Sequence, residues 1–281
     1  MMKNAFEIAG GTITGRVHKA NGKNNQDAFY FRAEDDLIIG IVSDGCGSGM
    51  HSEVGAKLGS RLIAEMIRTY INLGCTSLPR VLDEVRLNFL VQLQALVKNF
   101  GGSFSQTVVD YFLFTLVGFV ITEKETIVFS LGDGVVVING EIKKLGPFPN
   151  NAPPYIVYGI TNTSLGENNP ELLQFKIDYL AKTDDVECLL IGTDGADDLI
   201  ASADKNLPGK ELLVGELNQF WLEDRYFRNI DMVRRRLAAV NIDSVKYLRN
   251  VSSSITEVKK ENGLLLDDTT LVVVRRKITG S

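Results

Sequence analysis

Histidine is scarce in this sequence, and its cysteines are not arranged in pairs. The 281 residues include two histidines and three cysteines, and Cys46, Cys75 and Cys188 lie far apart without a CxxC spacing. A disulfide framework is therefore excluded, and a zinc site built from histidine is nearly excluded. Isolated cysteines of this kind are typical of a reducing compartment, so we expect a cytoplasmic protein.

An excess of basic residues and a long hydrophobic run are missing too. The net charge is −5, whereas a nucleic-acid-binding protein needs a basic face that neutralises phosphates. The most apolar segment, 108–121, is too short to span a bilayer and contains Asp110, so we expect a buried strand there. The first residues lack the pattern of a signal peptide. We therefore expect neither nucleic acid nor a membrane as a partner.

The sequence contains no repeat and no low-complexity tract. Its turn-rich segments, 146–154 and 162–170, are too short to be convincing interdomain linkers. Hydrophobic residues make up 44% of the chain, which is ample for a core. We predict a single domain over 1–281, with a variable lobe around residues 203–231.

Apolar spacing predicts helices and strands in separate parts of the chain. Intervals of three and four indicate a helix that Ser52 caps and that runs to residue 70, a second helix over 78–100, and a third within 230–251. Strands are predicted at 28–31, 37–42, 109–121, 126–131, 135–138, 141–145, 186–191 and 270–276. Asn139-Gly140 is a strong two-residue hairpin signal, and 122–125 forms another reversal. We therefore predict an α+β fold of antiparallel sheet layered with helices.

Several of these strands end in aspartate. Asp44, Asp133 and Asp194 each follow an apolar run and precede glycine, Asp267 and Asp268 directly precede TTLVVV, and Asp27 begins a short aromatic strand. An Asp-Gly hairpin turn explains Asp133 well, but not Asp44 or Asp194, after which no strand resumes.

A dinucleotide-binding turn is a second alternative for the segment with Gly45, Gly47 and Gly49. The sixth position of that fingerprint is Met50 rather than glycine or alanine, and Asp44 would repel a pyrophosphate. We therefore favour a third interpretation, in which the strand ends meet at one edge. Clustered carboxylates raise one another's pKa or bind cations, and oxygen ligands suit Mg²⁺ or Mn²⁺. Gly45 lets the backbone approach such an ion.

Five motifs follow one another along the chain, namely NNQDAFYF, VSDGCGSGMHSEVGA, SLGDGVVVI, IGTDGADDL and DDTTLVVV. In this order they resemble the metal-dependent protein phosphatases of the 2C type, and bacterial members most closely, and the resemblance covers residues 10–276. It implies a four-layer α-β-β-α sandwich, with two central antiparallel sheets flanked by helix pairs and a dinuclear Mg²⁺ or Mn²⁺ site at one end. It also implies a bacterial signalling enzyme that hydrolyses phosphoserine or phosphothreonine in proteins by attack of a metal-bridging water or hydroxide, and that works opposite a protein kinase.

The resemblance assigns the site residue by residue. Asp44 would bridge both ions, the Gly45 carbonyl would bind the second, and Asp194 and Asp267 would hold the first. These three aspartates are the catalytic candidates. Asp133 would join Asp194 at a weaker third metal site. Asp268, where many members have asparagine, and Gln26 would support the ligands from behind.

Three positions depart from the family pattern. Gln26 replaces an acidic ligand of the second ion, for which Asp27 is the candidate substitute. Cys46 replaces the histidine of eukaryotic members, which leaves His18 and His51 as candidate proton donors. Gly22 replaces the phosphate-binding arginine, so Lys23 is our candidate phosphate ligand, with Lys19 and Arg16 as alternatives. These departures keep a second hypothesis open, namely a catalytically weak module that binds phosphoproteins or regulates a partner.

Overall fold

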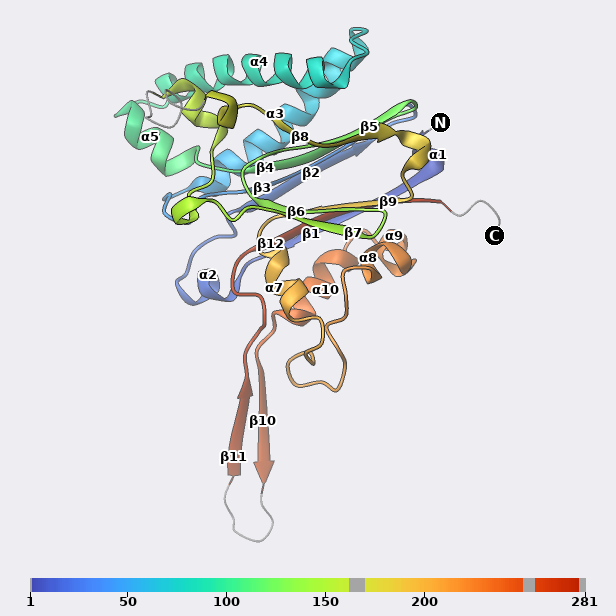
Figure 1. Cartoon of the computed structure of the whole chain (residues 1–281). Coiled ribbons are helices and arrows are strands. Elements are labelled where there is room, and N and C mark those ends of the chain that lie inside the picture. The colour runs from blue at the N-terminus through green and yellow to red at the C-terminus, as the bar shows by residue number, and fades with distance from the viewer. Residues whose placement is uncertain (1, 162–169, 250–255, 278–281) are drawn as a thin grey trace.

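Two five-stranded antiparallel sheets lie face to face in the middle of the molecule, with helices on both outer faces (Figure 1). The computed structural model describes residues 2–161, 170–249 and 256–277. The predicted α+β sandwich is confirmed. Of the predicted loop at 162–170, all but Pro170 lies outside the described residues.

The sheets are named here A and B. The strands of sheet A, in spatial order, are β1 (Phe6–Ile13), β12 (Thr269–Arg276), β9 (Cys188–Gly192), β6 (Gly134–Ile138) and β7 (Glu141–Leu145). Those of sheet B are β2 (Asp27–Ala33), β3 (Leu37–Asp44), β4 (Leu116–Thr122), β5 (Glu125–Leu131) and β8 (Lys176–Lys182). A separate hairpin consists of β10 (Ser244–Arg249) and β11 (Thr256–Glu261).

The predicted hairpin turns are present. Ile138 pairs with Glu141 across Asn139 and Gly140, whose φ angles of 51° and 88° are those that a two-residue turn of this kind requires. Ile121 pairs with Thr126, which confirms the second reversal.

Some predicted elements are wrong or were missed. The predicted strand 109–121 begins only at Leu116, because α5 (Phe104–Tyr111) occupies its first part and buries Thr107 and Val108. The helix predicted within 230–251 is present as α10 (Met232–Val240), but strand β10, which follows it, was missed. Strand β1 was missed because two glycines interrupt its pattern. Gly11 is needed there, since a Cβ would lie 2.5 Å from the backbone nitrogen of Arg234.

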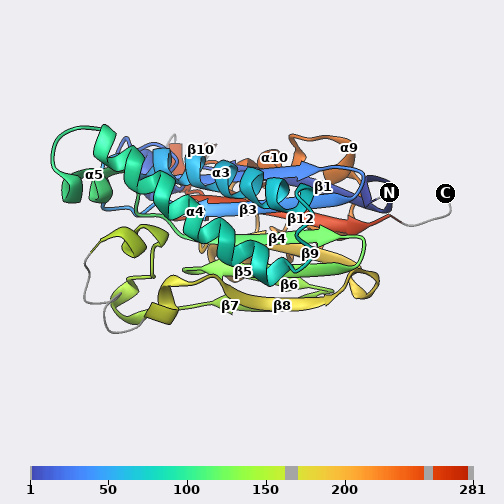
Figure 2. The same cartoon turned by 90° about the horizontal axis from the view of Figure 1, so that it is seen from above.

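Long helices cover sheet B and short ones cover sheet A. Figure 2 shows α3 (Ser52–Asn72) and α4 (Leu78–Asn99) lying over sheet B. His51 occupies the position before α3, so Ser52 lies inside the helix and is not its cap. The remaining helices are α1 (Met2–Ala5), α2 (Arg16–Ala20), α7 (Ala196–Ala201), α8 (Gln219–Leu222) and α9 (Arg225–Arg228), with short 3₁₀ turns at Pro149–Asn151, Ile156–Ile160, Pro170–Leu173 and Thr183–Asp185.

Apolar side chains fill all three spaces between the layers. One cluster lies between sheets A and B, a second between sheet B and α3 with α4, and a third between sheet A and the short helices. Phe220 and Tyr226, in the segment predicted as a variable lobe, are fully buried in the third cluster. Their role is therefore packing.

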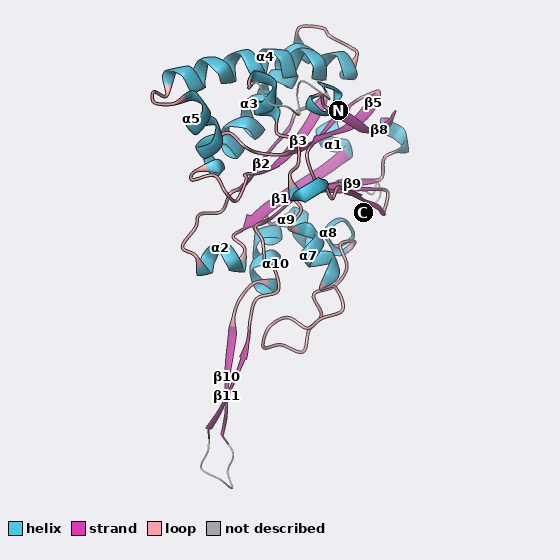
Figure 3. Ribbon diagram, turned by 60° about the vertical axis from the view of Figure 1, so that its left-hand side comes forward, coloured by secondary structure: helices cyan, strands magenta, loops and turns pink. Residues whose placement is uncertain are grey.

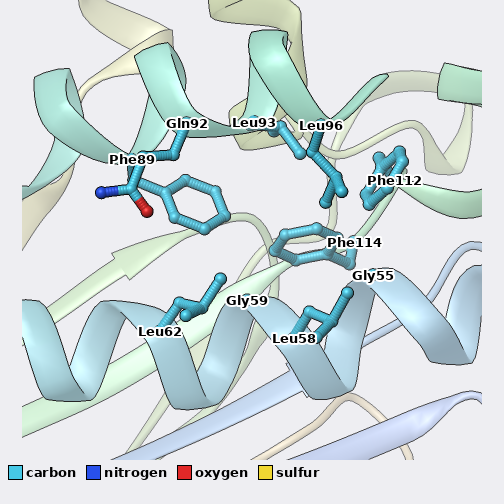
Figure 4. A pocket seen from close by; sticks show the side chains of 10 residues that line it. All are labelled: Gly55, Leu58, Gly59, Leu62, Phe89, Gln92, Leu93, Leu96, Phe112 and Phe114. Atoms are coloured by element: carbon cyan, nitrogen blue, oxygen red, sulfur yellow. The ribbon is translucent and has the colours of Figure 1, made fainter. Parts of the chain in front are cut away.

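A cavity of about 230 Å³ lies between α3 and α4 (Figure 4). Leucines of both helices and Phe89 line it, and the ring of Phe114 lies between the two helices. Two glycines of α3 allow this approach. A Cβ on Gly59 would lie 2.5 Å from the Phe114 ring, and one on Gly55 would lie 2.1 Å from the backbone oxygen of Tyr111.

These two glycines predict different costs for the same substitution. Gly55→Ala should destabilise the protein by about 1–3 kcal/mol, because the new methyl group meets backbone that cannot move away. Gly59→Ala should stay within about 1 kcal/mol of the parent protein, because the Phe114 ring can move into the cavity and alanine favours the helix. Urea unfolding measures both, with Lys57→Ala as the exposed control. Equal costs at the two glycines would show that the cavity does not receive the ring.

Candidate metal centre

The strand ends that carry the predicted site residues meet at one end of the sandwich. Asp27, the first residue of β2, pairs directly with Asp44, the last of β3. In sheet A, Gly192 pairs with both Val135 and Leu271. Continuing these registers by two residues places Asp194 opposite Asp133 and next to the start of β12, which Asp267 and Asp268 precede. The turn with Asp133 joins β5 of sheet B to β6 of sheet A.

The carboxylates are close enough to change one another's ionisation. Burial raises the pKa of Asp44 well above its usual value, and the charges of Asp27, Asp194 and Asp267 raise it further. Burial also raises the pKa of Asp194, to about 7, with added repulsion from Asp267 and Asp133. The structure thus brings together the aspartates that the sequence placed at separate strand ends.

Asp133 and Asp267 lie at the margins of this cluster. Burial raises the pKa of Asp133. Burial likewise raises the pKa of Asp267, although the backbone N–H of Asp268 and the nearby His18 act in the opposite direction. The Asp267 side chain is 55% exposed, so this carboxylate faces the outside of the cluster.

Asp27 is the most deeply buried member. Its side chain is 2% exposed, and burial raises its pKa well above the usual value. The Oδ2 atom accepts a hydrogen bond from Thr193 Oγ1 at 2.7 Å, whereas Oδ1 has no hydrogen-bond partner among the described residues. A buried carboxylate oxygen without a donor is costly. A cation at this edge would satisfy it.

Asp268 binds backbone amides rather than facing the cluster. Its Oδ1 accepts from Gly15 N at 2.7 Å and its Oδ2 from Gln26 N at 2.5 Å. His18 Nδ1 lies 2.9 Å from Asp268 Oδ2 and 3.8 Å from Asp267 Oδ1. The ligand atoms of these three side chains lie within 4.8 Å of one another. Because amides already occupy both Asp268 oxygens, its geometry is that of a residue that holds the segment before β2 in place.

Gly45 lies where a side chain does not fit. A Cβ there would lie 2.8 Å from both the Gln26 carbonyl oxygen and Ser52 Oγ. Gly45 N donates to the Gln26 oxygen at 3.1 Å, and Thr115 N donates to the Asp44 oxygen at 2.8 Å. Backbone bonds on both sides therefore fix the Asp44-Gly45 peptide.

Gln26 is buried and joins this loop to α3. Its Nε2 donates to Ser52 Oγ at 2.9 Å, while its Oε1 has no hydrogen-bond partner among the described residues. The amide that replaces the acidic ligand of the family pattern thus retains an unpartnered oxygen.

The other sequence candidates lie around this edge. Lys23 Nζ donates to Gly47 O at 2.6 Å, so the lysine lies across the loop that follows Asp44. Cys46 Sγ lies 3.1 Å from Ser48 Oγ; burial alone raises the pKa of the thiol, but hydrogen bonds with Ser48 and Tyr155 lower it overall. His51 packs against Tyr111 near Glu53, away from the aspartates. Of the two histidines, only His18 contacts the predicted site.

The sequence left two supporting residues unnoticed. Thr193 directly precedes Asp194 in the GTDG motif, and its hydroxyl both binds Asp27 and accepts from Thr270 N at 3.1 Å. Thr115 holds the backbone of Asp44 on both sides, since its hydroxyl accepts from Asp44 N at 3.3 Å. The position of Thr193 beside a motif aspartate was the available signal, whereas nothing in the sequence singles out Thr115.

The residues at this edge fit divalent cations. They offer carboxylate, amide and backbone oxygens, and the charges that act most strongly on Asp44 and Asp194 are other carboxylates. Mg²⁺ and Mn²⁺ favour such oxygen ligands. Their binding would relieve both the mutual repulsion and the unpartnered Asp27 oxygen.

Comparison with known proteins points to a family of metal-dependent enzymes. A family model for protein phosphatase 2C matches residues 14–242. A bacterial serine phosphatase with an arginine-to-lysine substitution superposes with a TM-score of 0.50 at 12% identity, covering 98% of this chain and 100% of its own. Its arginine-to-glutamate variant gives 0.51 at 14% identity, covering 97% and 99%. A search of curated proteins finds no significant match.

A protein from C. elegans has the same fold. A sex-determining protein of C. elegans superposes with a TM-score of 0.51 at 14% identity, covering 96% of this chain and 65% of its own. At such identities the superpositions show the fold alone. Together with the family match, they define the class of this protein as a phosphoprotein phosphatase. The chain belongs to the protein phosphatase 2C family, which is metal-dependent, and the family predicted from the five motifs is confirmed.

The raised pKa values predict how metal-free protein responds to pH. In the folded state Asp194 has a pKa of about 7, above its usual 3.8, so the folded state holds a proton that the unfolded state releases. Stability should therefore be highest below about pH 4 for this group and fall as the pH rises through 7. Melting temperatures in EDTA across this range measure the loss.

Two controls accompany this measurement. Asp194→Asn should flatten the decline, because the titrating group is gone, and added Mn²⁺ should raise the melting temperature most near pH 7. A metal-free protein that becomes more stable between pH 4 and 7 would contradict the mutual repulsion of these carboxylates.

Proposed function

We propose that this enzyme hydrolyses phosphoserine and phosphothreonine in proteins with two Mg²⁺ or Mn²⁺ ions held at the aspartate edge. The observation that carries this proposal is the convergence of three buried carboxylates from both sheets, those of Asp27, Asp44 and Asp194, which form no ion pair with the part of the chain that the structure describes. Phosphomonoester hydrolysis breaks the bond between phosphorus and the side-chain oxygen. Water supplies the new phosphate oxygen, and one of its protons is transferred to the released side-chain oxygen.

The proposed ligand set follows the sequence assignment. Asp44 serves both ions, the Gly45 carbonyl the second, and Asp194 and Asp267 the first. Asp133 and Asp194 form a weaker third site. The unpartnered oxygen of Asp27 supports assigning Asp27 to the second ion, directly or through a water, with Gln26 supporting the ligands. Bound ions of this kind lower the pKa of a coordinated water and stabilise charge on phosphoryl oxygens.

The chain's own residues orient the substrate and hold the ligands. Lys23 offers a cation at the rim, where its contact with Gly47 keeps it beside the Asp44 loop. Asp268 fixes the segment between Gly15 and Gln26, and Thr193 fixes Asp27. We assign Lys23 to the phosphate, and Asp268 to positioning.

The chain is proposed to act as one domain in the cytoplasm, opposite a protein kinase. All three cysteines are free, as expected in a reducing compartment. Within the described residues, no helix has the length and apolar character to cross a bilayer.

The second candidate is a module that binds phosphoproteins without turning them over. Gln26, Cys46 and Gly22, which replace family residues around the site, favour it. Calorimetric titration with a phosphoprotein at saturating Mn²⁺ separates the two candidates, since only the module would bind without releasing phosphate.

Hydrolysis of p-nitrophenyl phosphate tests the enzymatic proposal. Mn²⁺ should activate the protein, EDTA should abolish the activity, and Asp194→Asn should lower kcat at least about a hundredfold by removing a ligand. Asp197→Asn, next to the same edge but outside the ligand set, is the matched control. Activity that persists in EDTA and in Asp194→Asn would exclude a metal-dependent mechanism at this site.

The phosphate ligand is tested by substituting neighbouring lysines. Lys23→Met should raise KM roughly three- to tenfold with a smaller effect on kcat, because an exposed cation binds phosphate modestly. Lys19→Met, on the exposed side of α2, should leave KM unchanged. The reverse pattern would move the assignment to Lys19.

A further inference from the structure

Strands β10 and β11 form an arm that leaves the body of the protein (Figures 1 and 3). Among the described residues they pair only with each other, and a two-stranded hairpin alone is marginally stable in water. The family match ends at residue 242 and β10 begins at Ser244, so the arm lies outside the matched part of the chain. The family match therefore gives no account of it.

One face of the arm exposes apolar side chains. Tyr247 pairs directly with Val258, and Val245 lies two residues before Tyr247 on the same face, opposite Lys260. Their exposed fractions are 73% for Tyr247, 56% for Val258 and 48% for Val245. Exposed aromatic and β-branched residues on an open sheet edge are the features that invite another strand.

The other face places two lysines opposite each other. Lys246 pairs directly with Lys259, and like charges in this position are unfavourable. Glu261 lies 2.8 Å from Lys259 and compensates it in part. The two strands together carry four cationic and two anionic residues, in a chain whose net charge is −5. An acidic side chain beside Lys246 would relieve this repulsion.

The base of the arm is fixed to the metal edge. Asn241, which is buried, donates to the Thr14 oxygen at 3.0 Å and accepts from Leu265 N at 3.2 Å. Gly209 N donates to Glu261 Oε2 at 2.7 Å. Thr14 precedes the glycine that binds Asp268, and Leu265 lies two residues before Asp267. The base of the arm, where a bound segment would leave it, is therefore tied to the segments that carry the site residues.

We propose that the free edge of β10 binds an extended segment of the phosphoprotein substrate in which acidic residues alternate with β-branched apolar residues. Added as a third strand, such a segment places its apolar side chains beside Val245 and Tyr247 and its acids beside Lys246. The arm selects the substrate, and the metal edge hydrolyses its phosphoester. This inference rests on the proposed function for the identity of its partner.

Hydrogen exchange tests the arm without catalysis. The full chain with Mn²⁺ is mixed with an unphosphorylated peptide of alternating glutamate and valine. We expect slower exchange over Ser244–Arg249, and no slowing with a peptide of alternating lysine and valine. Equal protection by both peptides, or by neither, overturns the proposal.

Kinetics test its use in substrate selection. The substrate is a phosphoserine peptide joined through a flexible Gly-Ser linker to the glutamate–valine segment. Lys246→Glu and Tyr247→Ser should each raise KM for it by up to about tenfold. Both should leave p-nitrophenyl phosphate hydrolysis unchanged, because that ester is too small to reach the arm. Lys57→Glu, on the exposed side of α3, is the charge control and should change neither reaction.

The outcomes separate this inference from the proposed function. If the parent protein does not hydrolyse p-nitrophenyl phosphate, the proposed function fails. The exchange experiment alone then tests whether the arm binds an acidic extended segment. An unchanged KM in both arm variants overturns substrate selection. A dimer seen in sedimentation that Tyr247→Ser dissociates would assign the edge to a second copy of the chain, and would overturn the proposal too.

Discussion

Repulsion among buried carboxylates is the constraint around which this structure is arranged. Asp44 ends a strand of sheet B, Asp194 follows a strand of sheet A, and Asp27 lies beneath them almost without exposure. Burial raises the pKa of each, and the charges of neighbouring carboxylates raise it further, so the fold holds these side chains together against their repulsion. The favourable contacts near them, such as Thr193 with Asp27, bind neutral donors to single oxygens and leave the charge in place. Protons or bound cations are the remaining means of balancing it.

Asp268 shows how the two sheets are joined at this edge. Asp268 precedes β12 of sheet A, yet its carboxylate accepts hydrogen bonds from the backbone N–H groups of Gly15 and Gln26. Gln26 is the residue before β2 of sheet B. The same segment carries His18 and Lys23. The Asp268 carboxylate therefore fixes both ends of the loop between Gly15 and Gln26. The sequence motifs indicate only that this loop is polar and contains glycine. An asparagine, which many family members have at this position, offers one acceptor oxygen and would keep only one of these two hydrogen bonds.

The elements that were predictable are those whose signal is local. Asn139-Gly140 defines its own turn, and the spacing of α3 and α4 defines their buried faces. Strand β1 was not predictable, because Gly11 is required by the close approach of the Arg234 backbone, which is far away in the sequence. The segment of α5 was assigned to a strand because Val108 and Val109 favour one. At the site, the motif aspartates could be found by position, whereas Thr115 and the approach of His18 to Asp268 depend on contacts between segments far apart in the sequence.

The arm and the metal edge carry opposite charges within one chain. The arm is rich in lysine, whereas the metal edge is rich in aspartate. An acidic substrate segment would be repelled by the aspartates before the ions bind, and would compete for the ions afterwards. The lysines of β10 and β11 offer such a segment a separate place, outside the packed layers and beyond direct contact with the site. Because Asn241 and Glu261 fix the base of the arm, the arm keeps a defined orientation relative to the metal edge although the two are separate. Recognition by sheet extension can then vary in sequence without disturbing the carboxylates that the chemistry requires.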